Sequence, residues 1–249
     1  MGGVKVKSEN RLMTGKKSIS SQSLFHFTGY LSILKKILKD QLFLVRECEE
    51  HHWGGYKFSV PMACFCDIPL SKISSHINQY GCYGIGMSSK WANKKKLCSM
   101  IYVRNNSELS NWVNKTLERI ATHPDDTVNV ETLYLLSRIK KYRGKIPNKK
   151  VDKTGKEELV FFYDEREWRF VPKKLTIQDI IISKEDEFRC LQNIDKLSFE
   201  LSDIKYIIIK NESEREEMVK TIDGIDSEKD SLDILKSKIL TVQQIEQDF

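Results

Sequence analysis

Long hydrophobic runs are missing from this sequence of 249 residues. No apolar stretch approaches the roughly 18 residues of a membrane-spanning helix, so we expect no membrane span. The segment 1–6 lacks the hydrophobic core of a signal peptide, and Val6 stands where a myristoylation motif has Ser or Thr. Six cysteines in a chain of this length do not make a disulfide framework. Reduced thiols are the better interpretation of these cysteines. Together with the missing membrane span and signal peptide, they predict a soluble cytoplasmic protein.

A strong charge bias is also missing. The chain has 41 basic and 35 acidic residues, for a net charge of +6, which is too little for a dedicated DNA-packaging protein but compatible with a negatively charged substrate. Hydrophobic residues make up 40% and aromatic residues 10%, enough to bury a sizeable core, so wholesale disorder is excluded.

The pattern of apolar residues predicts one α+β domain over 23–249, preceded by a flexible basic arm over 1–22 that has no apolar period. Its core would be a mixed or antiparallel sheet with a helical insertion at about 107–145. Strands are expected at 23–28, 58–68, 80–88, 101–103, 158–163, 167–171, 179–183 and 204–210. Helices are expected at 30–39, 72–78, from 90 onward, twice within 107–143, and at 213–222, with a short strand and a helix in 234–249.

The first candidate pair is His26 and Thr28, which lie on one face of a strand because strand side chains alternate. One interpretation is a core histidine whose ring nitrogens bond to the backbone. The other is a site in which His26 and Thr28 hold a ribose hydroxyl and a carboxamide.

The second candidate group is Glu165, Glu167 and Arg169, which would project together from one strand. Two neighbouring carboxylates are costly unless a cation or a ligand uses them. Either Arg169 is that cation on a solvated surface strand, or a glutamate binds ribose hydroxyls and stabilises an oxocarbenium-like transition state.

Other motifs carry less information. The glycines of 80–86 mark either a ligand approach or a bulge, and no phosphate-binding loop is present. The Cys64-x-Cys66 pair lacks the usual spacing of zinc ligands, so we expect no metal. No Gly-x-Ser-x-Gly elbow of a serine hydrolase appears.

Several blocks together resemble the AbiGi-type abortive-infection family of phage-resistance proteins. The resemblance runs from about residue 23 to the C-terminus and rests on Leu24-Phe-His-Phe-Thr, Cys64-Phe-Cys-Asp-Ile-Pro-Leu-Ser, Tyr80-Gly-x-Tyr-Gly-Ile-Gly-Met-Ser and Asp164-Glu-Arg-Glu-Trp-Arg. It implies a role in antiviral defence. It also implies a non-enzymatic role as the antitoxin-side partner in a two-gene unit.

The order of the blocks is also similar to that of remote ADP-ribosyltransferases, which use NAD. That resemblance implies that His26 binds a ribose, that Tyr83 or else Tyr80 stacks on nicotinamide, and that Glu167 is the catalytic carboxylate with Glu165 as its companion. No arginine matches the clamp expected for the pyrophosphate. Such a site requires His26 and Glu167 to lie close together on the same side of the sheet.

A basic, turn-rich loop over 145–156 precedes the strand with the glutamates. Its lysines, with those at 94–96, either guide a nucleic-acid acceptor through phosphate contacts or only solvate the surface; the loop lysines proposed for contact are Lys149, Lys150, Lys153 and Lys156. The sequence thus leaves open an NAD-dependent transferase, a binding module that restrains a toxin, and a sensor of a phage component.

Overall fold

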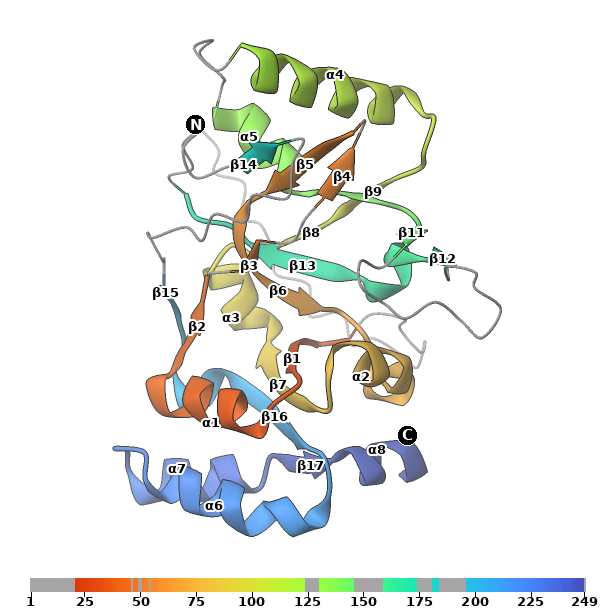
Figure 1. Cartoon of the computed structure of the whole chain (residues 1–249). Coiled ribbons are helices and arrows are strands. Elements are labelled where there is room, and N and C mark those ends of the chain that lie inside the picture. Colours follow the sequence, from red (N-terminus) through yellow and green to blue (C-terminus); the bar gives the residue numbers. More distant parts are fainter. Residues whose placement is uncertain are drawn as a thin grey trace, which may run out of the picture.

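A mixed β-sheet runs through the centre of the molecule (Figure 1). The computed structural model describes residues 21–45, 47–48, 51–53, 55–123, 130–145, 159–173, 181–183 and 196–248. In spatial order the strands of the central sheet are β17 (Ile239–Thr241), β16 (Ile204–Ile209), β7 (Tyr83–Ser88), β1 (Ser23–Thr28), β6 (Pro61–Cys66), β13 (Glu167–Phe170) and β8 (Cys98–Ser99). The pair β16 and β17 is parallel, whereas the other neighbours along this path are antiparallel.

Helices cover both faces of this sheet. On one face, which we call the α1 face, pack α1 (Leu31–Asp40), α3 (Ser89–Lys94), α6 (Arg215–Asp223) and α7 (Lys229–Lys236). On the other, the α2 face, pack α2 (Ser74–Tyr80) and α8 (Val242–Asp248). Apolar side chains spaced along α1 explain its place, because Leu34, Ile37 and Leu38 form one buried stripe.

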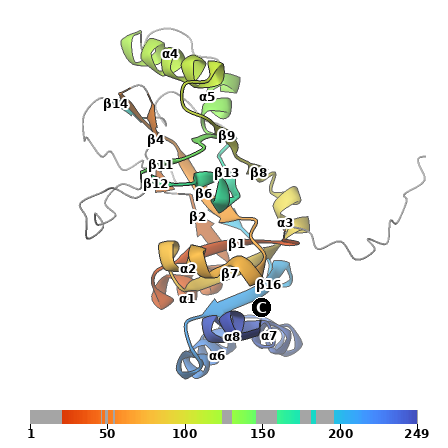
Figure 2. The same cartoon turned by 90° about the vertical axis from the view of Figure 1, so that its right-hand side faces the viewer.

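A three-stranded sheet, a strand pair and two further helices lie beyond β13, at the end of the molecule opposite to α6, α7 and α8 (Figure 2). These elements are β4 (His51–Trp53), β5 (Tyr56–Ser59), β14 (Ile181–Ser183), β9 (Ile101–Val103), β10 (Ile139–Lys141), α4 (Glu108–Thr122) and α5 (Val130–Leu136). They enclose a separate apolar core that includes Val113, Leu117 and Ile139. Strand β10 pairs in parallel with β9, residue 139 opposite 101.

The remaining elements are short. They are β2 (Leu42–Leu44) with β15 (Lys196–Ser198), β3 (Glu47–Cys48) beside β6, β11 (Gly144–Lys145) with β12 (Leu159–Val160), and the 3₁₀ turns η1 (Leu70–Lys72), η2 (Phe162–Glu165), η4 (Leu201–Asp203) and η5 (Glu212–Glu214). Among the described residues, no helix has the length and hydropathy needed to cross a bilayer.

The predicted α+β class is confirmed, as are the strand at 23–28 and the helix near 30–39. Ser88 caps α3 as a serine there was expected to do, because its hydroxyl accepts the backbone N–H of Trp91. The expected arm is described only from residue 21. There the Ser21 N–H donates to the carboxylate of Asp67 over 2.6 Å.

Two local predictions were wrong, and one helix was missed. The strand expected at 158–163 ends at Val160, because the chain coils into η2 and leaves it at Arg166 with a left-handed φ of 46°. The helical pattern that reaches Ile139 ends earlier, because residues 139–141 pair with β9 instead, so the insertion is not wholly helical. The short strand and helix expected within 234–249 are confirmed as β17 and α8, whereas α7, which buries Leu232 and Leu235 on the α1 face, was not predicted.

Candidate functional site

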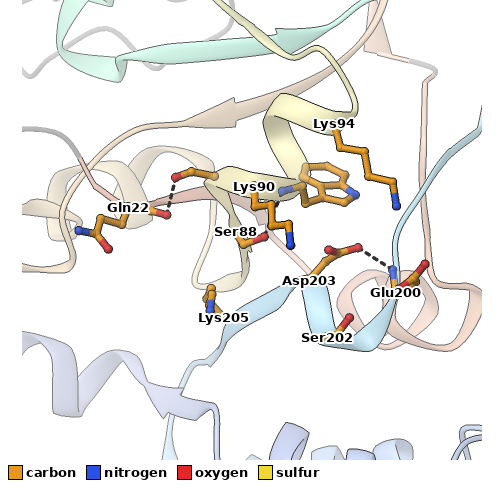
Figure 3. A pocket seen from close by; sticks show the side chains of 10 residues that line it. Gln22, Ser88, Lys90, Lys94, Glu200, Ser202, Asp203 and Lys205 are labelled. Carbon is orange, nitrogen blue, oxygen red and sulfur yellow. Dashed lines mark hydrogen bonds between the residues drawn. The ribbon is translucent and has the colours of Figure 1, made fainter. Parts of the chain in front are cut away.

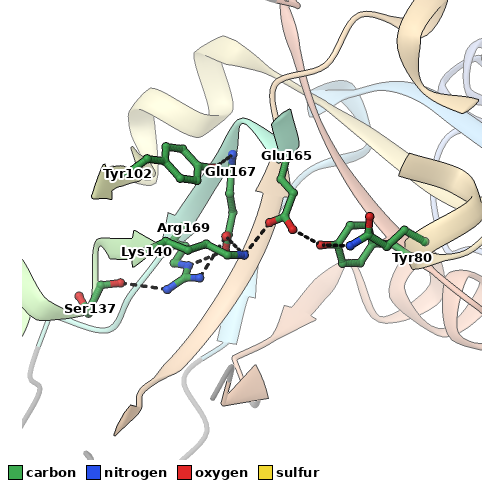
Figure 4. Close-up of polar contacts among 8 residues, drawn as sticks. Tyr80, Tyr102, Ser137, Lys140, Glu165, Glu167 and Arg169 are labelled. Carbon is green, nitrogen blue, oxygen red and sulfur yellow. Dashed lines mark hydrogen bonds and ion pairs between the residues drawn. The ribbon is translucent and has the colours of Figure 1, made fainter. Parts of the chain in front are cut away.

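Four charged side chains meet on the α2 face, where β13, η2 and β10 come together (Figure 4). They are Lys140, Glu165, Glu167 and Arg169, which we call the charge network. All four side chains are buried, and Arg169 is 0% exposed. Two carboxylates are therefore balanced by two cations inside the protein.

Lys140 is the centre of the charge network. Its Nζ lies 2.5 Å from Oε2 of Glu165 and 2.9 Å from Oε2 of Glu167. It also lies 5.1 Å from the centre of the Phe162 ring, so that the ammonium is attracted by the ring face as well. The sequence analysis did not identify Lys140 as a site residue. The only hint in the sequence is that this lysine directly follows the apolar residue Ile139.

Arg169 holds the second carboxylate with a guanidinium fork. Its Nε donates to Oε1 of Glu167 over 2.5 Å, its Nη2 donates to Oε2 over 3.0 Å, and its Nη1 donates to the Ser137 carbonyl over 3.2 Å. Both oxygens of Glu167 thus accept charge-assisted hydrogen bonds. The expectation that Glu167 and Arg169 share a strand face is confirmed, but the strand is buried and not solvated. Glu165, expected on the same strand, lies in the turn η2 before it.

The two carboxylates have opposite electrostatic environments. Burial opposes ionisation of Glu167, yet the adjacent Arg169 and Lys140 hold its pKa well below the usual range. Burial raises the pKa of Glu165 above its usual value, although Lys140 acts in the other direction. The network therefore keeps Glu167 ionised as the anion of a salt bridge.

Aromatic side chains lie around the charge network, and two tyrosines form hydrogen bonds with its glutamates. The Tyr80 hydroxyl donates to Oε1 of Glu165 over 2.5 Å. The hydroxyl of Tyr102 accepts the backbone N–H of Glu167 over 2.8 Å, and burial raises the pKa of this phenol. The ring of His76 packs on Tyr80 at 4.4 Å between centroids, and burial lowers the pKa of His76 to about 4.

The other predicted site residues lie on the opposite face of the sheet. Phe25 pairs with Cys66 and Cys66 pairs with Glu167, so these three point to the α2 face. His26 follows Phe25 and points to the α1 face, where its ring packs against Phe43 and Phe65. The expectation that His26 and Glu167 share one side of the sheet is therefore wrong, although their strands are separated only by β6.

His26 itself matches the interpretation as a core histidine. Its Nδ1 lies 2.8 Å from the backbone oxygen of Cys64. Thr28 is opposite Tyr83 in the pairing of β1 with β7, so both belong to the α1 face. The Tyr83 hydroxyl donates to Glu214 over 2.7 Å, and burial is the main reason why the pKa of this phenol is raised.

An NAD site composed of the predicted residues does not fit this arrangement. His26, Thr28 and Tyr83 lie on one face, whereas Tyr80, Glu165 and Glu167 lie on the other. Glu167 is 5% exposed, and both of its oxygens are occupied by cationic donors. No carboxylate of this group presents itself to a ribose beside Tyr83.

A polar groove of about 570 Å³ lies elsewhere, between α3 and the start of β16 (Figure 3). It is lined by Gln22, Ser88, Ser89, Lys90, Trp91, Lys94, Glu200, Ser202, Asp203 and Lys205. Of the predicted lysines that the structure describes, 94–96, only Lys94 borders the groove, and the groove has both basic and acidic side chains. Lys149, Lys150, Lys153 and Lys156 lie outside the described residues.

Within the part of the chain that the structure describes, no cluster of three His, Cys, Asp or Glu side chains could hold a metal ion. Cys64 and Cys66 lie on β6 and are not joined in a disulfide. Burial raises the pKa of Cys66, so this thiol behaves as a small core side chain.

Comparison with known proteins shows which protein family the sequence matches. A family model described as "Putative abortive phage resistance protein AbiGi, antitoxin" matches residues 41–210. The chain belongs to the AbiGi family. The AbiGi match includes β6, the whole charge network and most of the central sheet. The resemblance inferred from the sequence blocks is therefore confirmed.

One curated relative is named "Abortive phage resistance protein AbiGi" and comes from Lactococcus lactis subsp. cremoris. It is 29% identical over 223 residues, which cover 76% of this chain and 89% of the relative. No solved structure matches this AbiGi chain, so the ADP-ribosyltransferase-like type of the sheet is not confirmed.

Proposed function

We propose that this AbiGi protein acts in phage resistance as a non-catalytic antitoxin that binds and restrains a toxin partner. The charge network is the observation that carries the proposal. Both glutamates that looked catalytic in the sequence, Glu165 and Glu167, are buried and paired with cations. Their arrangement is that of a structural ion network.

Catalysis at a glycosidic bond requires a carboxylate that faces the substrate. The carboxylate of Glu167 faces Arg169 and Lys140 instead, at distances from 2.5 to 3.0 Å. Releasing it would leave a buried guanidinium without its partner, which costs several kcal/mol in typical cases, about 3–5. A binding function makes no such demand, because the network can stay closed throughout.

The description of the matching family supports an antitoxin role, since it names the family as an antitoxin. An antitoxin needs a well-ordered surface more than a reactive group. A fully satisfied buried polar network supports such order, because each member fixes the position of the next. Here the network joins β10, η2 and β13, of which β10 is distant in the sequence from the other two.

The test separates binding from catalysis with a neutral pair of substitutions. In Glu167→Gln with Arg169→Met, one anion and one cation disappear together, so that Lys140 and Glu165 remain paired. The chain would be produced together with the toxin of its defence unit, with growth rescue and co-elution in size-exclusion chromatography as readouts. Released nicotinamide would be measured after incubation with NAD.

We expect wild type to rescue growth, to co-elute with the toxin and to release no nicotinamide above the blank. The double variant, once a thermal melt shows that it is folded, should rescue growth as well. Nicotinamide release by wild type, or loss of rescue by the folded double variant without loss of co-elution, would contradict a binding role.

A further inference from the structure

Exposed aromatic side chains gather at one place beside the charge network. Leu159 is 59% exposed, and Phe161 and Tyr163 are each 48% exposed. Tyr102 and Tyr142 are half-buried beneath them. We call these five residues the aromatic surface; it lies at β12 and η2, which Figure 1 shows to the right of β13.

The rings of the aromatic surface support one another. Tyr163 contacts Tyr102 and Tyr142, with 5.4 Å between centroids in both pairs. Phe161 packs against Tyr142 at 5.9 Å, nearly edge to face. Because Tyr142 and Tyr102 hold them from below, Phe161 and Tyr163 are ordered rings whose outer parts remain in solvent.

Basic residues outnumber acidic ones in the segments that contain the aromatic surface and the charge network. The segments 101–104, 138–145 and 159–173 contain nine Lys or Arg residues and three Asp or Glu residues. Their net charge of +6 equals the net charge of the whole chain. Two of the acidic and two of the basic residues, Lys140 and Arg169, belong to the neutral charge network, and Arg166 pairs with Asp67.

Two exposed cations belong to the segments that carry the rings. Arg143 follows Tyr142 in the chain and is exposed. Arg104 is also exposed and follows β9, where the Tyr142 N–H donates to the carbonyl of Val103. Aromatic faces flanked by such cations are the elements with which proteins hold single-stranded nucleic acids: bases stack on rings, and cations follow the phosphates.

We propose that the aromatic surface is a binding site for single-stranded nucleic acid, with bases stacked on Phe161 and Tyr163 and phosphates held by Arg104 and Arg143. A duplex is a poorer ligand, because its base faces are already stacked on each other. The site is distinct from the four lysines expected from the sequence, and it adds a ligand to the toxin binding proposed above. A protein partner could also use aromatic and arginine side chains, and the experiment is arranged to detect that.

The experiment measures fluorescence anisotropy with a fluorescein-labelled 12-nucleotide oligo-dT, an oligo-U of equal length and a blunt 12-base-pair duplex. Wild type should bind both single strands more tightly than the duplex. Phe161→Ser with Tyr163→Ser should weaken single-strand binding by at least about tenfold, since base stacking contributes about 1–3 kcal/mol per base. Phe161→Leu with Tyr163→Leu keeps apolar bulk without a ring face and should weaken binding nearly as much.

Two controls match these variants. Trp112→Ser removes an aromatic side chain of α4 that is 38% exposed, and it should leave the affinity unchanged. Arg104→Ser with Arg143→Ser should lower the slope of log affinity against log salt by about 0.7 for each phosphate that is no longer neutralised, whereas Lys220→Ser on α6 should not change it.

Several results would overturn the proposal. One is failure of wild type to bind either oligonucleotide in 0.1 M salt, and another is equal affinity for the duplex. If the Phe161 and Tyr163 variants keep oligonucleotide affinity but lose co-elution with the toxin, the aromatic surface is a protein interface and the proposal is wrong. Oligonucleotide binding that depends on the rings, in a chain that does not bind toxin, supports this site while contradicting the antitoxin role.

Discussion

Replacing Lys140 by Met tests the charge network directly. The substitution keeps a chain of similar length, so the main change is removal of the ammonium between Glu165 and Glu167. The network, neutral in wild type, then holds two carboxylates against Arg169 alone. An uncompensated negative charge is left in a site where the side chains are less than 10% exposed.

The expected loss of stability follows from the distances. At an effective dielectric constant of about 20, contacts of 2.5 and 2.9 Å correspond to a gross attraction of about 12 kcal/mol. Desolvation of the ammonium and the carboxylates offsets most of this attraction. Breaking a buried pair by removing one partner costs about 3–5 kcal/mol in practice, and we expect Lys140→Met to lose that much stability at pH 7.

A second substitution makes the test specific to the pairing. Adding Glu165→Gln to Lys140→Met restores neutrality, because Glu167 and Arg169 then remain as a pair. The second change should therefore stabilise the Lys140→Met protein, by about 1–3 kcal/mol, although Glu165→Gln alone should destabilise wild type. The surface pair of Lys220 and Glu216 is the control, and Lys220→Met should cost less than about 1 kcal/mol.

Urea unfolding followed by tryptophan fluorescence supplies the free energies of unfolding for the cycle. The deficit of Lys140→Met should shrink as pH falls. Burial already raises the pKa of Glu165, and without Lys140 this carboxyl takes up a proton more readily in the folded state. If the effects of the two single variants simply add in the double variant, Lys140 and Glu165 are not coupled and the reasoning fails.

Three further predictions concern other parts of the molecule. Burial lowers the pKa of His76 to about 4, so below pH 6.5 the unfolded chain binds more protons than the folded protein. The free energy of unfolding should therefore fall by about 2 kcal/mol from pH 7.5 to pH 5. Thermal melts across this pH range should show that His76→Phe removes the dependence. Gly81 has a φ of 113° and a Cβ there would collide with the backbone of β1, so Gly81→Ala should cost about 1–3 kcal/mol while Gly29→Ala, which has open space, changes the melting temperature little. In the native protein iodoacetamide should label the exposed Cys98 but label Cys66 only after unfolding, as peptide mass spectrometry would show.

Local pattern sufficed for part of the candidate site. The period of two correctly placed Glu167 and Arg169 on one face of a strand, since that relation depends on two adjacent alternations only. It could not show that the strand is buried. The covering segment, residues 137–141, joins η2 and β13 through contacts between residues 25 or more positions apart, and its own sequence continues a helical pattern.

The sequence could not predict that His26 and Glu167 lie on opposite faces of the sheet, and here the reason is different. Which face each side chain takes depends on the registers of β1 with β6 and of β6 with β13. A shift of one residue in either register would have put the two side chains on the same face. The strand order brings β1 and β13 near enough for a shared site. The registers, however, put the two side chains on opposite faces of the sheet.

The charge network and the aromatic surface are mechanically linked through η2. Phe162 lies over Lys140, and Glu165, three residues later, is held by the same ammonium. Between them Tyr163 is turned outward, and Phe161 precedes the turn. Breaking the network should therefore disorder the turn that presents both exposed rings. On this view the glutamates that resemble catalytic residues contribute to binding at a distance, because they fix the turn whose other side meets the ligand.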